Sequence, residues 1–214
     1  MVESYNIRAV YAKQLNLHAH ILIAEAYTKI DFQSFVTSEE TTITGELVRR
    51  MREYLESYEA PSWGVYYSIG DDSPLSVDGK YGKYRPRIDI EVERTGIRGT
   101  RPRLRFEAKR LGKTSGHTVS TYLGPDGMGC FISGKYPLTH DEAGMLGYLQ
   151  SDNENEWSNK IENALVKGSD RYHVVSPPYR KQKICSLEHT YLSHHFCDSR
   201  TTVISIHHIL LRFY

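Results

Sequence analysis

The stretch Arg85–Arg110, with the sequence RPRIDIEVERTGIRGTRPRLRFEAKR, decides how the chain folds in our interpretation. It contains two similar pieces, RPRIDIEV at 85–92 and RPRLRFEA at 101–108, joined by a link with two glycines. Each piece alternates apolar and charged residues with a period of two, which is the pattern of a β-strand with one buried face. The stretch therefore predicts two paired strands whose apolar faces meet a core and whose charged faces lie together on the other side.

The charged face of this predicted hairpin brings three chemically useful residues together. Neighbouring strands lie about 4.8 Å apart and alternate residues about 6.6 Å apart, so Asp89 can meet Glu107 and Lys109. Two carboxylates suit a hard divalent cation such as Mg²⁺, and a lysine beside them can orient a water or stabilise charge on a phosphate. The alternative is an ordinary charged strand face with cross-strand ion pairs.

Asp89, followed after 17 intervening residues by Glu107-Ala108-Lys109, resembles the motif of the PD-(D/E)xK nuclease superfamily. The chain departs from the family pattern in having Ile88 before the aspartate and its nearest proline at Pro86. The resemblance implies an α/β fold with a restriction-endonuclease-like core in the order α-β-β-β-α-β, in which helices flank a mixed central sheet. It also implies Mg²⁺ as the cofactor, with Mn²⁺ as a substitute, bound by Asp89 and Glu107 while Lys109 activates a water.

The segment from Thr37 to Tyr58 is the clearest helix in the sequence. Thr37 and Glu40 have the spacing of a capping box, and apolar residues follow with helical periodicity until the chain approaches Pro61. Glu46 lies at the edge of the apolar stripe and resembles the helix glutamate of the nuclease superfamily, which makes it the fourth catalytic candidate. The alternative is a surface carboxylate paired with the arginines that follow it in the sequence.

The net charge of +1 does not by itself indicate a nucleic-acid-binding protein, but the charges are unevenly distributed. Between Lys83 and Lys113 there are eleven Lys and Arg against four Asp and Glu, a local +7 that leaves −6 for the remainder. Because phosphate contacts dominate nucleic-acid affinity, this basic stretch favours a nucleic-acid partner. A solvated basic hairpin is the plainer interpretation. The predicted phosphate-binding residues are Arg87, Arg103, Arg105 and Arg110.

The sequence indicates one domain over residues 1–214. We expect a peripheral helical segment at 1–36, the catalytic core at 37–175 and a C-terminal extension at 176–214 that packs on the core. Within the core, strands are predicted at 63–69, 128–133 and 173–175. A second capping box at Thr139 predicts a helix to Gln150, where the superfamily often carries a polar residue near its site.

Composition excludes several other classes of protein. No stretch approaches the ~20 apolar residues of a membrane span, no secretory signal is visible at the N-terminus, and the three cysteines do not form a disulfide framework. We therefore expect a cytoplasmic protein with no membrane association. A run of Cys and His near the C-terminus leaves a zinc site open, although its spacing matches no paired-ligand pattern: Cys185, His189, His194, His195 and Cys197.

Three hypotheses for the function follow. The leading one is a Mg²⁺-dependent endonuclease acting on nucleic-acid phosphodiesters, with DNA favoured. The strings FEAKRL, GKYPLTHDEAGMLGYLQ and IHHILLRF also resemble small bacterial nucleases of anti-phage defence over roughly residues 35–214, which implies a defence role, a partner protein in that system and, by analogy, a homodimer. The second is an inactive nucleic-acid-binding or assembly module of the same fold. The third is a protein-interaction domain that docks an acidic partner on the charged hairpin.

Overall fold

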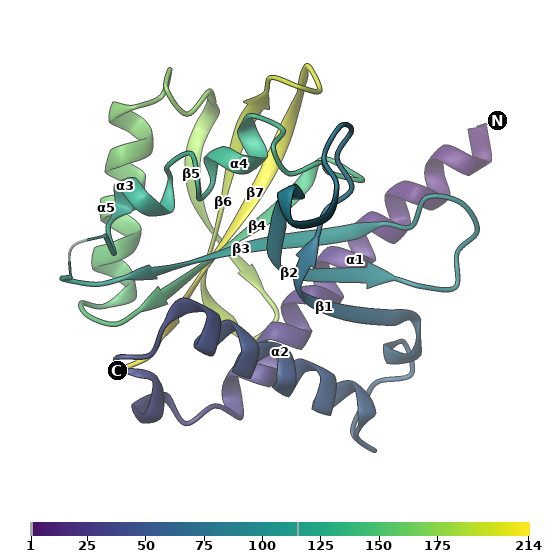
Figure 1. Cartoon of the computed structure of the whole chain (residues 1–214), viewed down its shortest axis with the longest axis horizontal. Helices are drawn as coiled ribbons and strands as arrows, with labels where there is room; N and C mark the ends of the chain where they lie inside the picture. The colour runs from purple at the N-terminus through teal and green to yellow at the C-terminus, as the bar shows by residue number, and fades with distance from the viewer. Residues whose placement is uncertain (1, 115) are drawn as a thin grey trace.

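A seven-stranded mixed β-sheet forms the centre of the computed structural model, which describes residues 2–114 and 116–214 (Figure 1). The strand order across the sheet is β1-β2-β3-β4-β7-β6-β5. β4 pairs in parallel with β3 and β7, and the other neighbours are antiparallel. The strands are β1 (Tyr67–Pro74), β2 (Arg87–Arg94), β3 (Arg103–Leu111), β4 (Glu142–Leu149), β5 (Val174–Ile184), β6 (Leu187–Cys197) and β7 (Thr202–Arg212).

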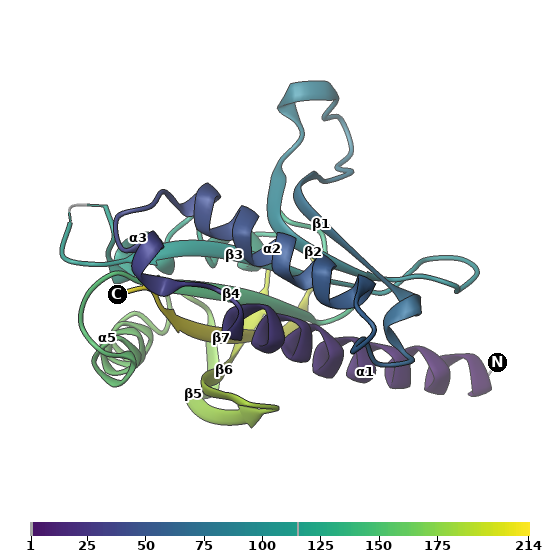
Figure 2. The same cartoon turned by 90° about the horizontal axis from the view of Figure 1, so that it is seen from below.

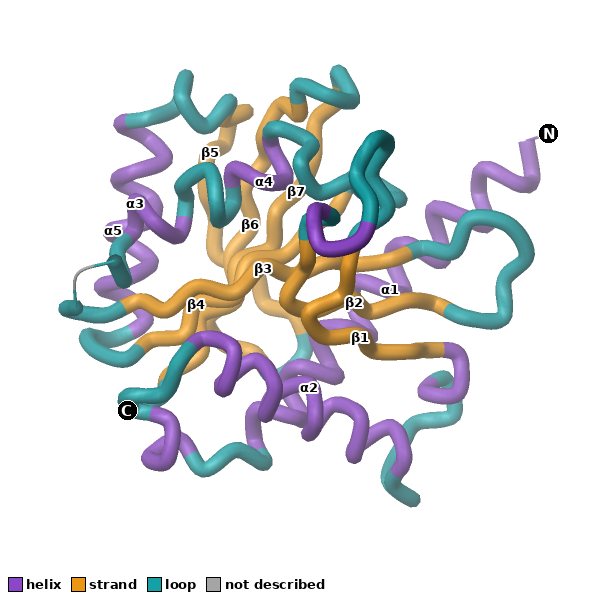
Figure 3. Tube along the Cα trace, viewed as in Figure 1, coloured by secondary structure: helices purple, strands orange, loops and turns teal. Residues whose placement is uncertain are grey.

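Helices cover both faces of this sheet, which makes the chain an α/β protein (Figure 3). α1 (Val2–Thr28) and α2 (Glu40–Glu56) pack on one face, and the short helices α3 (Val119–Tyr122) and α4 (Gly129–Ile132) pack with α5 (Glu154–Lys167) on the other. Short 3-10 helices are η1 (Phe32–Phe35), η2 (Gly64–Tyr66) and η3 (Gly82–Tyr84). None of the helices in the described residues is long and apolar enough to cross a membrane.

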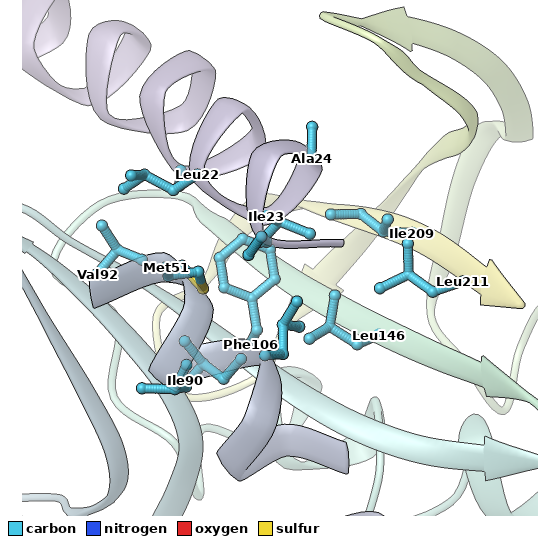
Figure 4. Close-up of a cluster of buried hydrophobic side chains, with 14 of the residues drawn as sticks. Leu22, Ile23, Ala24, Met51, Ile90, Val92, Phe106, Leu146, Ile209 and Leu211 are labelled. Atoms are coloured by element: carbon cyan, nitrogen blue, oxygen red, sulfur yellow. The ribbon is translucent and has the colours of Figure 1, made fainter. Parts of the chain in front are cut away.

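The predicted hairpin is present and forms the β2–β3 pair. The two strands are antiparallel, with Ile90 opposite Phe106 and Val92 opposite Leu104. All four of these side chains are fully buried, as the period-two pattern predicts. They join α1, α2, β4 and β7 in one core cluster, in which the Phe106 ring lies at the centre (Figure 4).

Two elements of the predicted core are of the wrong type. The segment predicted as a helix from Thr139 to Gln150 is strand β4, and the strand predicted at 128–133 is helix α4. Residues 143–149 are all buried, because β4 lies between two parallel neighbours and under helices on both faces. A strand of this kind is a continuous apolar run, which periodicity cannot distinguish from a buried helix.

Both terminal segments are more central than predicted. α1 is not peripheral, since Leu15, Ala19 and Leu22 are fully buried in the core beneath the sheet. Residues 176–214 are not an extension packed on the core, because they supply most of β5 and all of β6 and β7, and β7 lies in the middle of the sheet. The strand predicted at 173–175 continues to Ile184, with a break in its pairing to β6 between Val175 and Arg180.

Candidate functional site

The candidate site lies where β2 and β3 separate at the end of their ladder. The last paired residues on this side are Ile90 and Phe106. Beyond them the Ala108 amide donates a hydrogen bond to Asp89 Oδ2 at 2.7 Å instead of to the neighbouring backbone. The Asp89 side chain therefore takes the place of a ladder bond and is fixed between the strands.

Glu107 is the most strongly perturbed carboxyl of the site. Its side chain is buried, and its Oε1 accepts a hydrogen bond from Lys109 Nζ at 2.7 Å. Its Oε2 is buried and has no hydrogen-bond partner within the part of the chain that the structure describes. Burial, followed by the nearby Asp89 charge, raises the pKa of Glu107 to about 8 despite the attraction of Lys109. The ionised form of Glu107 is thus disfavoured even beside the Lys109 ammonium.

Asp89 shows the same effect in a weaker form. Burial raises its pKa above the ordinary value, while the Ala108 amide and the Lys109 ammonium act in the opposite direction. Two carboxyls of raised pKa therefore lie on the two strands at the opening between β2 and β3. Such a pair gains more from a bound cation than two solvated carboxylates would.

Lys109 is held by three oxygen atoms. Its Nζ donates to Glu107 Oε1 at 2.7 Å, to the Ala108 carbonyl at 2.8 Å and to Glu40 Oε1 at 3.0 Å. Burial alone would lower the pKa of Lys109, but the carboxylates of Glu107, Glu40 and Asp89 together raise it. The lysine is therefore a fixed ammonium at the centre of the site.

Glu40, at the start of α2, is the site residue that the sequence did not reveal. Besides accepting from Lys109, it accepts from the Arg110 backbone amide through Oε2 at 3.1 Å. The helix begins at Glu40 with Glu39 as its N-cap, and no side chain caps it. The predicted capping box is therefore not formed. The same spacing that suggested a capping role for Glu40 concealed its contact with β3.

Glu46, the predicted helix glutamate, lies elsewhere. Its carboxylate accepts from Arg49 Nη2 at 2.6 Å and from Arg50 Nε at 2.8 Å, within α2. These arginines hold the pKa of Glu46 below its ordinary value. In the described residues Glu46 makes no hydrogen bond or ion pair with Asp89, Glu107 or Lys109. The structure thus favours the surface interpretation of Glu46 and brings Glu40 to the site in its place.

The four predicted phosphate-binding arginines are all paired with carboxylates. Arg105 is buried, bonds Glu91 at 2.7 Å and also donates to the Pro137 carbonyl, so it is a structural ion pair and not an exposed phosphate ligand. The other three are more exposed but also paired: Arg103 with Glu93, Arg87 with Asp72 and Arg110 with Glu39. An incoming phosphate would have to compete with these acids.

Two further polar groups border Glu107. Tyr136 and Cys130 lie near its carboxyl, and burial together with this charge raises the pKa of both. Gln150, predicted on a following helix, lies at the end of β4, and its amide donates to the Ser38 carbonyl at 2.9 Å. Gln150 therefore fixes the segment that leads into α2 and Glu40.

The donors present fit a hard divalent cation, but not as a cluster of three side chains. Among the described residues no group of three or more His, Cys, Asp or Glu side chains has metal-binding geometry. Asp89, Glu107 and the Ala108 carbonyl supply oxygen donors, of which Glu107 Oε1 and the Ala108 oxygen now accept from the Lys109 ammonium. Oxygen ligands completed by waters are what Mg²⁺ prefers.

The Cys and His run of the C-terminal segment is not brought together as a metal site in the described residues. Cys197 is buried, and its thiol lies 3.5 Å from the Phe131 carbonyl, while His195 is occupied by Ser193 and the Tyr172 carbonyl. Cys197 and His195 are buried side chains, whereas Cys185, His189 and His194 are only partly buried.

Comparisons of the chain with protein-family models, with curated proteins and with solved structures found no match.

Proposed function

We propose that the chain is a Mg²⁺-dependent nuclease of the restriction-endonuclease-like type, with its site at Asp89, Glu107, Lys109 and Glu40. The observation that carries the proposal is the pairing of the buried Glu107 and the half-buried Asp89, both of raised pKa, with a fixed lysine on adjacent strands that diverge at that point. Perturbed carboxyls beside a specific charged partner are typical of catalytic sites.

Each residue has a role that follows from its contacts. Asp89 and Glu107 would hold the cation, which when bound supplies a Lewis acid for the scissile phosphate and a water of lowered pKa. Lys109 would hold a water or stabilise negative charge on a phosphate oxygen once a bound cation takes over the Glu107 and Ala108 oxygens that two of its three N–H donors now bond. Glu40 anchors the lysine and links α2 to β3 through the Arg110 amide.

The wider assignment rests on the sequence resemblance. We propose DNA as the substrate, cytoplasmic action in anti-phage defence with a partner protein of that system, and a homodimer as the working form. A binding module of the same fold is the second candidate, and the observation favouring it is that Lys109 already occupies the oxygen atoms a cation would need.

Cleavage of a supercoiled plasmid and of short oligonucleotides in Mg²⁺, Mn²⁺ or EDTA tests the proposal. Wild type should cut only with a divalent cation, and Glu107→Gln and Lys109→Met should each lower the rate by on the order of 100-fold or more. Lys113→Met is the matched control, because this lysine side chain is 79% exposed, lies beyond the end of β3 and pairs with Asp152 and not with the site carboxyls. It should cut like wild type.

Other outcomes separate the alternatives. Cutting that survives both substitutions, with circular dichroism showing folded variants, would show that the site is assigned wrongly. Nucleic-acid binding without cutting in either cation would support the inactive binding module. A folded protein that neither binds nucleic acid nor responds to Mg²⁺ would support the protein-interaction domain.

A further inference from the structure

The segment between β1 and β2, residues 75–86, stands well away from the body of the molecule (Figure 2). It contains η3 and has the sequence LSVDGKYGKYRP, in which basic and aromatic residues alternate. We call it the projecting loop. Neither the core nor the candidate site uses its tip.

The base of the projecting loop is firmly tied to the sheet. The Leu75 amide donates to the Pro86 carbonyl at 2.7 Å, and the Leu75 side chain is 2% exposed in the core. Arg85 joins the two ends of the loop, because its Nε donates to the Leu75 carbonyl at 2.9 Å and its Nη2 donates to the Pro74 carbonyl at 2.5 Å. These contacts at the base fix the direction in which the tip of the loop, residues 80–84, leaves the sheet.

The tip presents two aromatic rings and two ammonium groups to solvent. Tyr81 and Tyr84 are 79% and 73% exposed. Lys80 and Lys83 are also exposed, and Lys83 Nζ lies 5.4 Å from the centroid of the Tyr84 ring. Neither lysine forms an ion pair within the described residues, whereas Arg87 at the base is paired with Asp72. Exposed rings next to unneutralised cations are the combination that binds bases and phosphates together.

The projecting loop is also close to the candidate site. Tyr84 is five residues before Asp89, which limits their separation to about 17 Å of extended chain. A groove of about 410 Å³ beside the loop base is lined by Arg85, Arg103 and Arg105, with Glu91 among them. A nucleic-acid strand that crosses the site can therefore reach the loop within a few nucleotides.

We propose that the projecting loop is an arm that binds single-stranded nucleic acid, with Tyr81 and Tyr84 stacking on unpaired bases and Lys80 and Lys83 contacting phosphates. Paired bases in a duplex are stacked on one another, so their faces are open to side chains only where a strand is unpaired. This inference rests on the proposed function for its substrate class and adds the preferred form, a single strand or an unpaired region.

Fluorescence anisotropy in EDTA tests binding without cutting. The probes are a labelled 20-nucleotide DNA strand of mixed sequence and the same strand annealed to its complement. Wild type should bind the single strand at least tenfold more tightly. The double variant Tyr81→Ala/Tyr84→Ala should weaken that binding by on the order of 10-fold per tyrosine. The variant Lys80→Gln/Lys83→Gln should reduce the slope of log Kd against log salt by about 1.4, since each phosphate contact contributes about 0.7.

Tyr58→Ala is the matched control, because this tyrosine is also exposed but lies beyond the end of α2. It should bind like wild type. Equal binding of duplex and single strand, or wild-type binding by the tyrosine double variant, would overturn the inference. If the tyrosine variant loses binding while wild type cuts nothing in Mg²⁺, the arm is supported and the nuclease fails. If wild type cuts and the tyrosine variant binds normally, the nuclease stands and the arm fails.

Discussion

At the scale of single residues, the site carboxyls can be neutralised either by the Lys109 ammonium or by a divalent cation. The oxygens of Glu107, Glu40 and Ala108 surround the Lys109 ammonium. Even so, the pKa of Glu107 remains at about 8, because burial and Asp89 outweigh the lysine. One ammonium therefore does not satisfy this group of carboxyls. A divalent cation next to Asp89 and Glu107 would lower both carboxyl pKa values by direct attraction.

The two helix glutamates provide the sharpest test at this scale, because both lie on α2 and only one contacts the site. Glu40→Gln should lower kcat/KM for cleavage by about 10- to 100-fold, since groups that orient the atoms around a metal typically have effects of this size. Glu46→Gln should leave cleavage within about threefold of wild type, because it disrupts only pairs with Arg49 and Arg50 at the helix surface. Steady-state cleavage rates in Mg²⁺ measure both.

Glutamine keeps the size of the side chain, so neither substitution should unfold the chain, and thermal unfolding checks this. If Glu46→Gln is the damaging change and Glu40→Gln is silent, the sequence-based choice of Glu46 was right and the contact of Glu40 with Lys109 has no role in cleavage.

At the scale of elements, the sequence predicted those with one buried face. β2 and α2 show a clear period because their other side is more exposed, and β3 shows one because charged residues alternate with apolar ones, although Arg105 and Glu107 are buried. β4 is buried on both faces, so its sequence shows no alternation of apolar and polar residues, and the prediction of a helix there was wrong. α1 carries its apolar residues around much of its surface, and this hid how deeply its second half is buried.

The part of the candidate site that lies on the hairpin was predictable from the sequence, and the part that depends on long-range packing was not. Asp89, Glu107 and Lys109 lie on the hairpin, and its geometry places them together from sequence alone. The contact of Glu40 with Lys109 joins residues 69 positions apart, and only the packing of α2 over β3 creates it. The burial of Arg105 likewise depends on Glu91 and on the Pro137 carbonyl, which no local pattern reveals.

The close approach of β4 to β3 gives a prediction at this scale. A Cβ added at Gly144 would lie 2.0 Å from Cδ1 of Phe106, a ring that is fully buried in the core (Figure 4). Gly144→Ala should therefore lower the free energy of unfolding by roughly 1–3 kcal/mol or more, as overpacked cores do. Urea unfolding followed by circular dichroism measures the change.

Gly45→Ala is the matched control, because a Cβ at this α2 position has nothing within 4 Å. It should stabilise the protein by roughly 0.5–1 kcal/mol, the helix preference of alanine over glycine. If Gly144→Ala is as stable as wild type, β4 does not pack against Phe106 as described.

At the scale of the whole molecule, buried histidines connect α1 to the C-terminal strands. His20 of α1 lies 5.2 Å from His207 of β7 between ring centroids, and Asn16 of α1 bonds both His207 and Glu142 of β4. His195 and His208 are fully buried between β6, β7 and the helices on the opposite face. The two faces of the sheet therefore both depend on uncharged imidazoles.

The hydrogen bonds around His195 and His208 fix which ring nitrogens carry protons. The Tyr172 carbonyl can only accept, so His195 Nδ1 donates to it at 2.7 Å and its Nε2 accepts from the Ser193 hydroxyl at 2.6 Å. Ser193 Oγ then accepts from His208 Nε2 at 2.7 Å, and His208 Nδ1 accepts from the Tyr122 hydroxyl at 3.0 Å. In this arrangement every ring nitrogen is satisfied with both rings neutral, and a further proton on His195 Nε2 or His208 Nδ1 would require the Ser193 or Tyr122 hydroxyl to give up the hydrogen bond that it donates.

This arrangement predicts a loss of stability in mild acid. Burial lowers the pKa of His20 and His195 to about 4 and that of His208 to about 3, from an ordinary value of 6.5. The unfolded chain therefore binds more protons between these values, and stability present above pH 6.5 is lost as the pH falls towards 4. Each histidine contributes roughly 2 kcal/mol of loss between pH 7 and pH 5.

The sum over the three rings is a large fraction of the stability of a typical domain, so we expect the free energy of unfolding to fall as the pH is lowered from 7 to 5. The raised pKa values of Glu107, Asp89 and Glu142 act in the opposite direction. His140 and His207, whose pKa values burial also lowers, act in the same direction as the three rings. Urea titrations at pH 7, 6 and 5 measure the effect. His20→Met keeps the buried volume and removes one titrating ring, so it should recover roughly 2 kcal/mol at pH 5, whereas His117→Met on the loop after β3 should not. Stability that stays constant or rises from pH 7 to pH 5 would mean that these imidazoles are not held neutral in the fold, and the connection of α1 to β7 would then need a different physical basis.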